Sequence, residues 1–321
     1  MKGIGLFSGG LDSQLAAKLI MVQKVDVLLV HFTHVFLTER LDDVKHYAEN
    51  LGAPLEVIDV SEDMVEIVKQ PSHGYGDTMN PCIDCRIMTL VKAKQFMEDE
   101  DDFIFTGEVV GQRPMTQMRH IMRYIERCAG LENKVVRPLS QKLLWETIPE
   151  KKGILDRNRL LAISGRGRYM QEELAKIFGI KEFPAPAGGC LLTDPGFSQR
   201  VKDAIEHDEL SVKDVILLKL GRHFRLPSGS KLILGRNRSE NNKLEQLAEE
   251  NDVLLRTPLN NAPIGVLRHG KLEDLQLAMR ILLRYAKGER RVIVWDKRGN
   301  RSFFVTEPLQ ASEVTKFMVK L

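Results

Sequence analysis

The first 110 residues alternate short apolar runs with segments in which apolar residues recur at helical spacing. The run at residues 25–32 is nearly continuous, which is typical of a strand buried on both faces. Strands are predicted at residues 4–7, 25–32, 55–60 and 103–106, and helices at residues 11–22, 39–51 and 82–97. Strands that alternate with helices require crossover connections. We therefore expect an α/β domain in which helices cover both faces of a parallel sheet.

The pattern changes in the second half of the chain. Residues 114–180 predict mostly helix, and a loop rich in proline and glycine follows at residues 184–189. The remainder reads as a smaller α+β module, with strands expected at 231–234, 264–267, 291–295 and 302–305 and helices at 240–250 and 271–287. The polar stretch at 206–214 is the predicted hinge. The expected domains are therefore residues 1–205 and 212–321.

Composition and charge refine this picture. The chain has 321 residues, 43% of them hydrophobic, which is ample for two ordinary cores. No apolar run reaches the roughly 18 residues that span a bilayer, and the N-terminus shows no secretory signal, so we expect a cytoplasmic protein without a membrane partner. Residues 211–321 carry 21 Lys and Arg against 12 Asp and Glu, a net charge of +9. Residues 1–210 carry the other 26 basic and 32 acidic residues, a net charge of −6. A basic module joined to an acidic one indicates a polyanionic partner; a solvated basic surface is the alternative.

A glycine turn separates the first predicted strand from the first predicted helix. It consists of Ser8, Gly9, Gly10, Leu11, Asp12 and Ser13. Two glycines allow successive N–H groups to point into one concavity, and the helix N-terminus adds further donors, so the turn suits phosphate. Asp12 would repel bare phosphate, which indicates a magnesium ion between the two. A plain turn that caps a helix is the alternative.

This SGGLDS turn resembles the SGGxDS loop of the ATP pyrophosphatase, or PP-loop, superfamily. Members of that superfamily cleave ATP between the α and β phosphates and adenylylate a substrate carbonyl. The resemblance implies ATP and Mg²⁺ as cofactors and a PP-loop, adenine nucleotide alpha-hydrolase-like fold. It also implies that His31 and Phe32, at the end of the second predicted strand, line the adenine pocket. His31 reads equally well as a packed histidine.

The four cysteines are the second source of candidate chemistry. Cys82 and Cys85 form a C-x-x-C at the start of a predicted helix, where the helix N-terminus favours thiolate. Cys190 follows the proline- and glycine-rich loop, which allows it to approach the pair, and Cys128 reads as a packed thiol. The trio is compatible with a redox pair, a structural zinc site, a persulfide carrier with a resolving cysteine, or a [4Fe–4S] cluster with one open iron. Thiols that only pack in the core are a further alternative.

Three further segments resemble tRNA thiolation enzymes. Residues 106–117, TGEVVGQRPMTQ, resemble the TGExxGQxxSQT segment of tRNA 4-thiouridine synthetases, and residues 137–142 resemble their RPLxxxDK segment. The NPCxxC at residues 80–85 is similar to a segment of the tRNA 2-thiouridylases. The resemblance covers about residues 1–205 and implies that Gly107, Gln112 and Lys142 belong to the ATP site.

The chain also departs from these families. Gln141 stands where an Asp is usual, and Thr116 stands where Ser is usual. We find neither a THUMP-like RNA-binding domain nor a rhodanese domain. The departures favour a cluster or an external sulfur donor (sulfide, a cysteine desulfurase or a carrier) over an internal persulfide relay.

Basic residues indicate where RNA would bind. Residues 221–241 resemble the NFACT-R RNA-binding module of ribosome-associated proteins, with Phe224 interleaved among arginines as if for base stacking. Arg119, Arg123 and Arg127 recur at the spacing of one helix face. The cations predicted to contact RNA are Arg113, Arg119, Arg123, Arg222, Arg225, Arg236 and Arg238. Solvated surfaces are the alternative for each set.

Together these observations favour an ATP-dependent tRNA sulfurtransferase. A uridine C2 or C4 carbonyl would be adenylylated and its oxygen replaced by sulfur, with Asp12, Cys82 and Cys190 as catalytic residues. An amidating PP-loop ligase that uses ammonia is one alternative, and a non-enzymatic RNA- or ribosome-binding protein is another. The modified carbon, the sulfur donor and the oligomeric state, for which a homodimer is an option, stay open.

Overall fold

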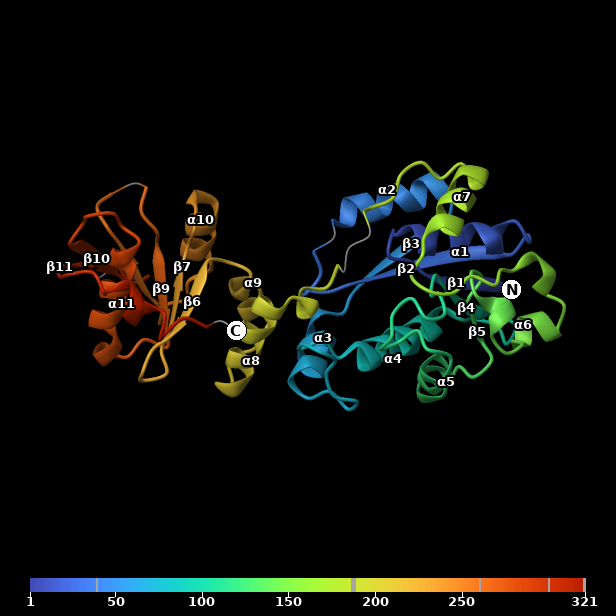
Figure 1. Cartoon of the computed structure of the whole chain (residues 1–321), viewed down its shortest axis with the longest axis horizontal. Helices are drawn as coiled ribbons and strands as arrows, with labels where there is room; N and C mark the ends of the chain where they lie inside the picture. Colours follow the sequence, from blue (N-terminus) through green and yellow to red (C-terminus); the bar gives the residue numbers. More distant parts are fainter. Residues whose placement is uncertain (39, 186–188, 260, 300, 320–321) are drawn as a thin grey trace. The chain divides into compact units, whose positions relative to one another are not determined.

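In the computed structural model of this protein, the N-terminal residues form a five-stranded, fully parallel sheet of order β3-β2-β1-β4-β5 (Figure 1). The strands are β1 (Lys2–Leu6), β2 (Asp26–Thr33), β3 (Leu55–Asp59), β4 (Phe103–Thr106) and β5 (Val135–Val136). The chain builds outward from β1 first on one side and then on the other. Loops after β1 and β4 therefore meet at the topological switch point, where open α/β sheets bind ligands.

Helices cover both faces of this sheet. They are α1 (Leu11–Met21), α2 (Leu41–Leu51), α3 (Ser61–Lys69), α4 (Cys82–Ala93), α5 (Arg119–Cys128), α6 (Ile148–Lys151) and α7 (Tyr169–Phe178). Ala16 of α1 and Ala48 of α2 share a buried cluster with Phe105. Leu90 of α4 and Ile125 of α5 share another with Ile104, the next residue along β4. Because neighbouring strand residues point to opposite faces, the predicted α/β fold with helices on both faces is confirmed.

The segment predicted as mostly helical, 114–180, is the main secondary-structure prediction that was wrong. Within it α5, α6 and α7 are separated by long loops and short 3-10 turns. Side chains bind the loop backbone in place of helix hydrogen bonds: the Ser140 hydroxyl accepts from Val110 N–H (3.0 Å) and donates to Ile163 O (2.6 Å). Such long-range partners leave no periodic signal in the sequence.

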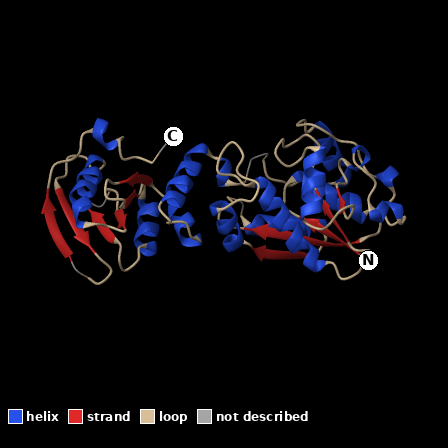
Figure 2. Cartoon of the chain, turned by 90° about the horizontal axis from the view of Figure 1, so that it is seen from below, coloured by secondary structure: helices blue, strands red, loops and turns tan. Residues whose placement is uncertain are grey.

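The C-terminal residues form a separate six-stranded antiparallel sheet of order β11-β10-β8-β9-β7-β6 (Figure 2). Its strands are β6 (Arg222–Arg225), β7 (Lys231–Leu234), β8 (Val253–Arg256), β9 (Gly265–Arg268), β10 (Arg291–Trp295) and β11 (Arg301–Val305). The accompanying helices are α8 (Pro195–Glu206), α9 (Val212–Leu218), α10 (Arg238–Leu247), α11 (Leu272–Arg284) and α12 (Ala311–Val314). One cluster joins α11 to Val292 and Val294, and a second joins α9 and α10 to Val266.

The two units divide between Thr193 and Asp194. This division falls before α8, whereas the sequence placed it after that helix. Asp194 begins α8 by accepting from Phe197 N–H (2.6 Å), and Pro195 occupies the first helical position. The structure describes residues 1–38, 40–185, 189–259, 261–299 and 301–319. The predicted start of a helix at residue 39 and the middle of the 184–189 loop lie outside these ranges. Within them, no helix is long and apolar enough to cross a membrane.

Candidate nucleotide and thiol site

The glycine turn after β1 presents free backbone donors at the start of α1. Gly9 has φ +74°, and a Cβ there would lie 2.9 Å from the Tyr47 ring, so glycine is required. Gln14 Nε2 donates to Gly9 O (2.7 Å) and Ser13 Oγ donates to Gly10 O (2.8 Å), which fixes the bend. No side chain described in the structure caps α1 at Gly10. Its first N–H groups are therefore available to an anion.

The loop after β4 closes against this turn. A Cβ on Gly107 would lie 2.6 Å from the backbone of Asp12 and Ser13, so only glycine permits this approach. Gln112 Nε2 donates to Asp12 Oδ2 (3.0 Å). The other carboxylate oxygen, Asp12 Oδ1, is buried and has no hydrogen-bond partner among the described residues. An unpaired buried carboxylate oxygen beside a phosphate-type turn has the chemistry of a magnesium ligand.

Other residues predicted for the ATP site have different contacts. His31 is buried, and its Nδ1 lies 2.9 Å from Phe7 O, directly before the glycine turn. Burial lowers the pKa of His31, so the imidazole is neutral and supports the loop backbone. Phe32 is half-buried against the core cluster on the α4 side of the sheet. Lys142 Nζ donates to Asn158 O (2.8 Å) and shows no contact with the glycine turn in the described structure.

Cys82 and Cys85 occupy the first turn of α4, as predicted. Asn80 Nδ2 donates to Cys82 Sγ (3.2 Å). Asp84, between the two cysteines, accepts from His73 N–H (3.0 Å) and pairs with His73 Nδ1 (2.7 Å). These contacts hold the loop that leads into α4 and so set where Cys82 begins the helix. Cys128 is exposed at the end of α5, so the prediction of a thiol packed within a helix was wrong.

Cys190 reaches this region through strand-like pairing with residues 36–38. Leu37 forms an antiparallel bridge with Cys190, and Leu191 N–H donates to Phe36 O (2.9 Å). Burial raises the pKa of Cys190 to about 12, and the neighbouring sulfurs of Cys85 and Cys82 contribute to the rise while Arg113 opposes it. Burial likewise raises the pKa of Cys85 to about 11. Thr78 Oγ1, in the loop that leads into α4, donates to Leu192 O (2.7 Å), which holds the segment after Cys190 beside that loop.

The described residues contain no group of three His, Cys, Asp or Glu arranged to hold a metal ion. The predicted cluster is thus not confirmed by this arrangement. In donor type alone, Cys82, Cys85 and Cys190 fit such a cluster, because cysteine thiolates are the ligands that hold iron–sulfur clusters.

Sequence reasoning missed a buried ionic cluster behind the site. Arg137 is 1% exposed; its Nε donates to Glu108 (3.0 Å) and its Nη1 pairs with Glu126, which is fully buried. Arg86, the residue after Cys85, pairs with the other oxygen of Glu108 (3.1 Å). Glu108 therefore ties the loop that packs on the glycine turn to the helix that carries Cys82 and Cys85. Glu108 of the TGE segment and Arg137 of the RPL segment were both noted in the sequence, but nothing there indicated that they pair.

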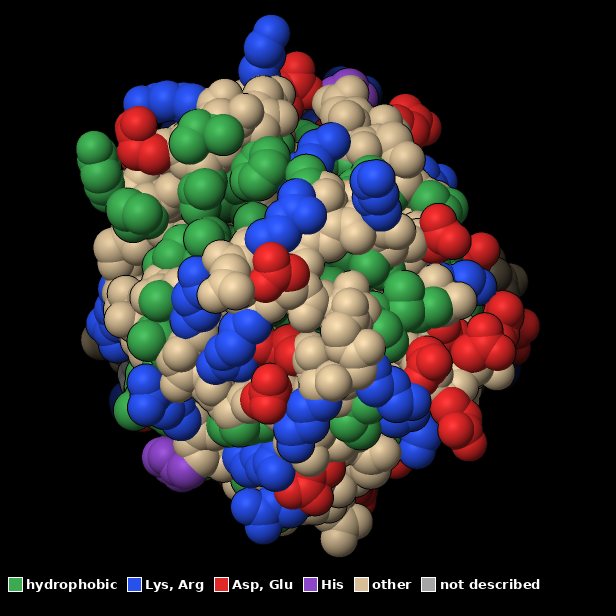
Figure 3. Space-filling model, turned by 90° about the vertical axis from the view of Figure 1, so that its right-hand side faces the viewer, with side chains coloured by type: hydrophobic (Ala, Val, Ile, Leu, Met, Phe, Trp, Pro, Cys, Tyr) green, Lys and Arg blue, Asp and Glu red, His purple; other side chains and the backbone are tan. Residues whose placement is uncertain are grey.

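The cations predicted to bind RNA in the N-terminal unit differ in availability. Arg113 and Arg119 are exposed. Arg123 instead bonds to Glu132 and Asn133 (both 2.7 Å) and lies over Trp145. Its charge is used within the fold. On the face of this unit that Figure 3 shows, basic and acidic side chains are interspersed, without one continuous basic surface.

The cations in the C-terminal unit also divide into two groups. Arg225 pairs with Asp203 (2.8 Å) and Glu209 (2.7 Å), so its guanidinium is occupied. Arg222 lies over Tyr285, and Arg236 pairs with Glu240 (2.6 Å). Phe224 is fully buried, which removes it as a stacking surface. Arg238 is exposed and has no ion-pair partner among the described residues.

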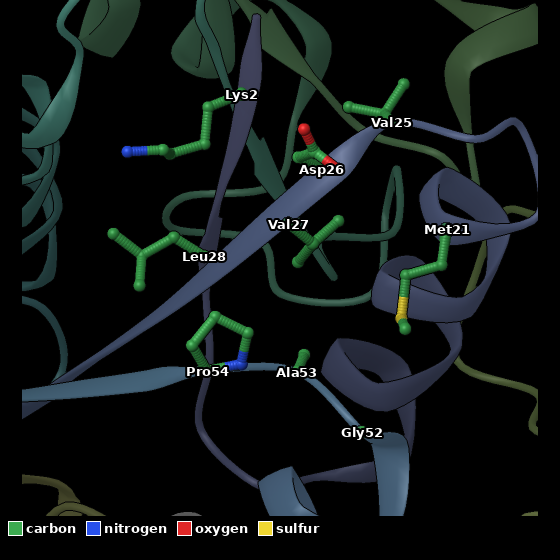
Figure 4. A pocket seen from close by; sticks show the side chains of 9 residues that line it. All are labelled: Lys2, Met21, Val25, Asp26, Val27, Leu28, Gly52, Ala53 and Pro54. Atoms are coloured by element: carbon green, nitrogen blue, oxygen red, sulfur yellow. The ribbon is translucent and has the colours of Figure 1, made fainter.

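A hollow lies at the opposite, amino-terminal edge of the parallel sheet (Figure 4). Its lining is mainly apolar and includes Met21, Val25 and Pro54. It shares no residue with the glycine turn or the cysteines, so it is separate from the candidate site.

Comparison with known proteins places this geometry in context. The fold is a parallel α/β unit, with a glycine turn after its first strand, joined to an antiparallel unit. Residues 1–123 match the family model described as "tRNA methyl transferase HUP domain", and residues 221–318 match "NFACT protein RNA binding domain". The two resemblances predicted from the sequence are thereby confirmed, each over part of the chain.

Curated relatives include the tRNA-specific 2-thiouridylase MnmA. The protein from Rhizobium etli is 31% identical over 133 residues, which is 35% of this chain and 32% of that protein. The protein from Treponema denticola is 34% identical over 120 residues, 33% of each. This chain thus spans about a third of the length of the relatives that it matches.

Among solved structures, two similar chains have TM-scores of 0.37. One is a predicted subunit of tRNA methyltransferase from Methanocaldococcus jannaschii, with 16% identity, covering 55% of this chain and 76% of that one. The other is a 4-thiouridine synthetase–RNA complex with bound ATP, with 21% identity, covering 68% of this chain and 52% of that one.

Proposed function

We propose that this protein is an ATP-dependent tRNA sulfurtransferase. The observation that carries the proposal is the convergence on one turn of Asp12, Gly107 and Gln112, in the same unit as the free cysteines Cys82, Cys85 and Cys190. The similarity to tRNA-specific 2-thiouridylases supports the thiolation of tRNA. The match of the C-terminal unit to an RNA-binding domain supports a tRNA substrate.

The glycine turn would bind the phosphates of ATP. The uncapped N–H groups at the start of α1, with the hydroxyls of Ser8 and Ser13, would hold the β and γ phosphates. Asp12 Oδ1 is the atom that would bind Mg²⁺, while Gln112 holds Oδ2 in place. When bound, the ion supplies positive charge that offsets the repulsion between carboxylate and phosphate.

The first step would activate a uridine. Its carbonyl oxygen attacks the α-phosphorus, the bond from that phosphorus to the bridging oxygen breaks, and pyrophosphate leaves. The backbone donors of the turn stabilise the charge that develops on pyrophosphate. The base must leave its stack for this attack, because the carbonyl has to reach the α-phosphorus.

The second step would replace the oxygen. Sulfur adds to the activated carbon, and AMP leaves with the oxygen that came from uridine. A cysteine desulfurase or a carrier would deliver sulfane sulfur to Cys190 as a persulfide, and its terminal sulfur would attack the activated carbon. Cys82 would then break the S–S bond by attacking Cys190 Sγ, which leaves the terminal sulfur on uridine and forms a Cys82–Cys190 disulfide that an external thiol reduces. Cys82, at the first position of α4, is placed to act as the thiolate.

The same three cysteines, Cys82, Cys85 and Cys190, would hold a [4Fe–4S] cluster. When bound, such a cluster supplies an open iron for sulfide. The role of the protein would then be to hold the segment at 189–191 near the start of α4, and the hydrogen bond from Thr78 Oγ1 to Leu192 O (2.7 Å) supports this role.

Cysteine variants test this proposal. The full chain, prepared without oxygen, is incubated with ATP, Mg²⁺ and bulk tRNA, and the sulfur source is either sulfide or a cysteine desulfurase with cysteine and a thiol reductant. AMP, pyrophosphate and thionucleosides are measured. We expect Cys82→Ser and Cys190→Ser to release pyrophosphate but to form no thionucleoside. Cys128→Ser, which changes an exposed cysteine outside the trio, is the matched control and should retain both activities.

Each alternative has its own outcome in the same assay. An ammonia-dependent ligase would keep full product formation in the cysteine variants. A protein that only binds RNA would release neither AMP nor pyrophosphate.

A further inference from the structure

We propose that the open face of β10 and β11 is a stacking platform for an unpaired RNA base, with Phe303 as the stacking ring. The inference rests on the proposed function, which gives the C-terminal unit an RNA partner. It identifies a surface distinct from the cations of residues 221–241.

The strand register defines this face. Arg301 pairs with Trp295, Phe303 with Ile293, and Val305 with Arg291. Paired residues of antiparallel strands lie on the same face. One face of the two strands therefore carries Phe303 flanked by two arginines and a tryptophan, and we call this set the edge platform.

Helices cover the opposite face and only part of this one. On the opposite face Val292 and Val294 pack against α11. On the platform side, Trp295 packs with Leu247 of α10, and Lys297 Nζ donates to Glu245 O (2.8 Å). β11 is the edge strand, as Figure 1 shows, and all five of its residues are exposed.

The platform is highly exposed on β11, whereas Ile293, which pairs with Phe303 from β10, is buried. Phe303 is 73% exposed and Val305 is 76% exposed. A large aromatic ring held on a strand with most of its surface in water points to a partner that buries it. The sheet backbone fixes the ring, so little side-chain entropy would be lost when a base stacks on it.

The charge around Phe303 favours RNA over an apolar protein surface. The Arg256 guanidinium lies 5.3 Å from the Trp295 ring centre, on the platform side of β8. Arg301 is exposed and has no ion-pair partner among the described residues. Arg291 is 64% exposed but pairs with Glu289 (2.9 Å), so its charge is partly neutralised. A ring beside an unpaired arginine, Arg301, matches a base together with its phosphate.

Binding of the full chain to labelled RNA tests the platform. The probes are an oligouridylate of about ten nucleotides and a blunt RNA duplex, since only the first offers unpaired bases. We expect Phe303→Ala to weaken oligouridylate binding about tenfold and to leave duplex binding unchanged, while Phe303→Trp retains binding. Ile177→Ala removes a similarly exposed apolar side chain (75%) from the N-terminal unit and is the matched control.

Charge and fold are checked in the same series. Arg301→Gln should reduce the dependence of log K on log salt by about one for the oligouridylate. The melting temperature should not change in Phe303→Ala, because the side chain is mostly exposed.

Three results would overturn the platform. If the wild type binds oligouridylate tightly and Phe303→Ala binds it equally well, the platform proposal is wrong, but the proposed function is not contradicted. Failure of the wild type to bind any RNA removes both. Self-association of the wild type that Phe303→Ala abolishes would show instead that the edge strand is a protein interface.

Discussion

The two units of this protein use their charged side chains in different ways. In the N-terminal unit, Asp12 and Gln112 come from distant segments and meet where the strands end. In the C-terminal unit, cations that are close in sequence have different partners: Arg225 pairs with Asp203, whereas Arg222, three residues earlier on β6, lies over the Tyr285 ring. Parallel topology gathers loop residues at one edge, but strand alternation divides neighbouring residues between two faces. A cluster of arginines in a sequence therefore does not by itself define a binding surface.

The largest expected effect is on stability, at the buried cluster behind the N-terminal site. Arg137→Met removes the guanidinium that the buried Glu108 and Glu126 share, which leaves Glu108 with Arg86 (3.1 Å) and Glu126 with the longer contact to Arg123 (3.7 Å). Breaking a buried ion pair from one side costs about 3–5 kcal/mol. Denaturant unfolding should show this loss, and the exposed Arg119→Met is the control. A change no larger than that of the control would mean that water already solvates the two carboxylates.

The next effect is catalytic and tests the approach of the β4 loop. Gly107→Ala places a Cβ where the Asp12 backbone lies, so the glycine turn must shift. Displacement of reacting groups by about 1 Å lowers rates about 100-fold, and pyrophosphate release should fall accordingly.

Gly167→Ala is the matched control for this substitution, because nothing lies within 4 Å of a Cβ at that position. Full activity in Gly107→Ala would show that the turn and the loop move independently.

A smaller effect is expected in how the free energy of unfolding of the C-terminal unit depends on pH. Burial alone would raise the pKa of Asp203, but Arg225 and Lys231 lower it to about 2. A carboxyl group with a lowered pKa stabilises the fold above its unfolded pKa, by about 2 kcal/mol for this shift. This contribution is lost as pH falls from about 4 towards 2.

Unfolding measured against pH should therefore show less loss of stability between pH 4 and 2 in Asp203→Asn than in the wild type. Glu206→Gln, which changes an exposed carboxylate on the same helix, should behave as the wild type. Equal slopes in all three proteins would mean that Asp203 is not held by its cations.

The smallest expected effect distinguishes an exposed cation, Arg238, from a cation that is paired within the fold, Arg225. Arg238→Ala should leave the free energy of unfolding unchanged within about 0.5 kcal/mol and reduce the salt dependence of tRNA binding by about one contact. Arg225→Met should do the reverse, because its guanidinium is used by Asp203 and Glu209. A lost RNA contact in Arg225→Met at unchanged stability would reverse the assignment.

Much of the first unit could be predicted because its signals are local. The strand at 103–106 and the glycine turn both follow from short patterns, since a buried parallel strand is continuously apolar. The strand Arg222–Arg225 was not predicted, because arginines in a sequence indicate a solvent-exposed segment. Arg225 instead pairs with Asp203, a residue of α8 that the local sequence does not reveal as its partner. The approach of Cys190 to α4 depends on pairing with residues 36–38, about which neither segment carries a local signal.

The most direct test of the central claim follows an oxygen atom. The full chain is incubated with ATP, Mg²⁺, sulfide and tRNA whose uridine carbonyls carry oxygen-18, and AMP is weighed by mass spectrometry. If the glycine turn activates uridine for sulfur transfer, labelled AMP appears in step with thiouridine. AMP that forms without the label would show that ATP is merely hydrolysed, and would contradict the account.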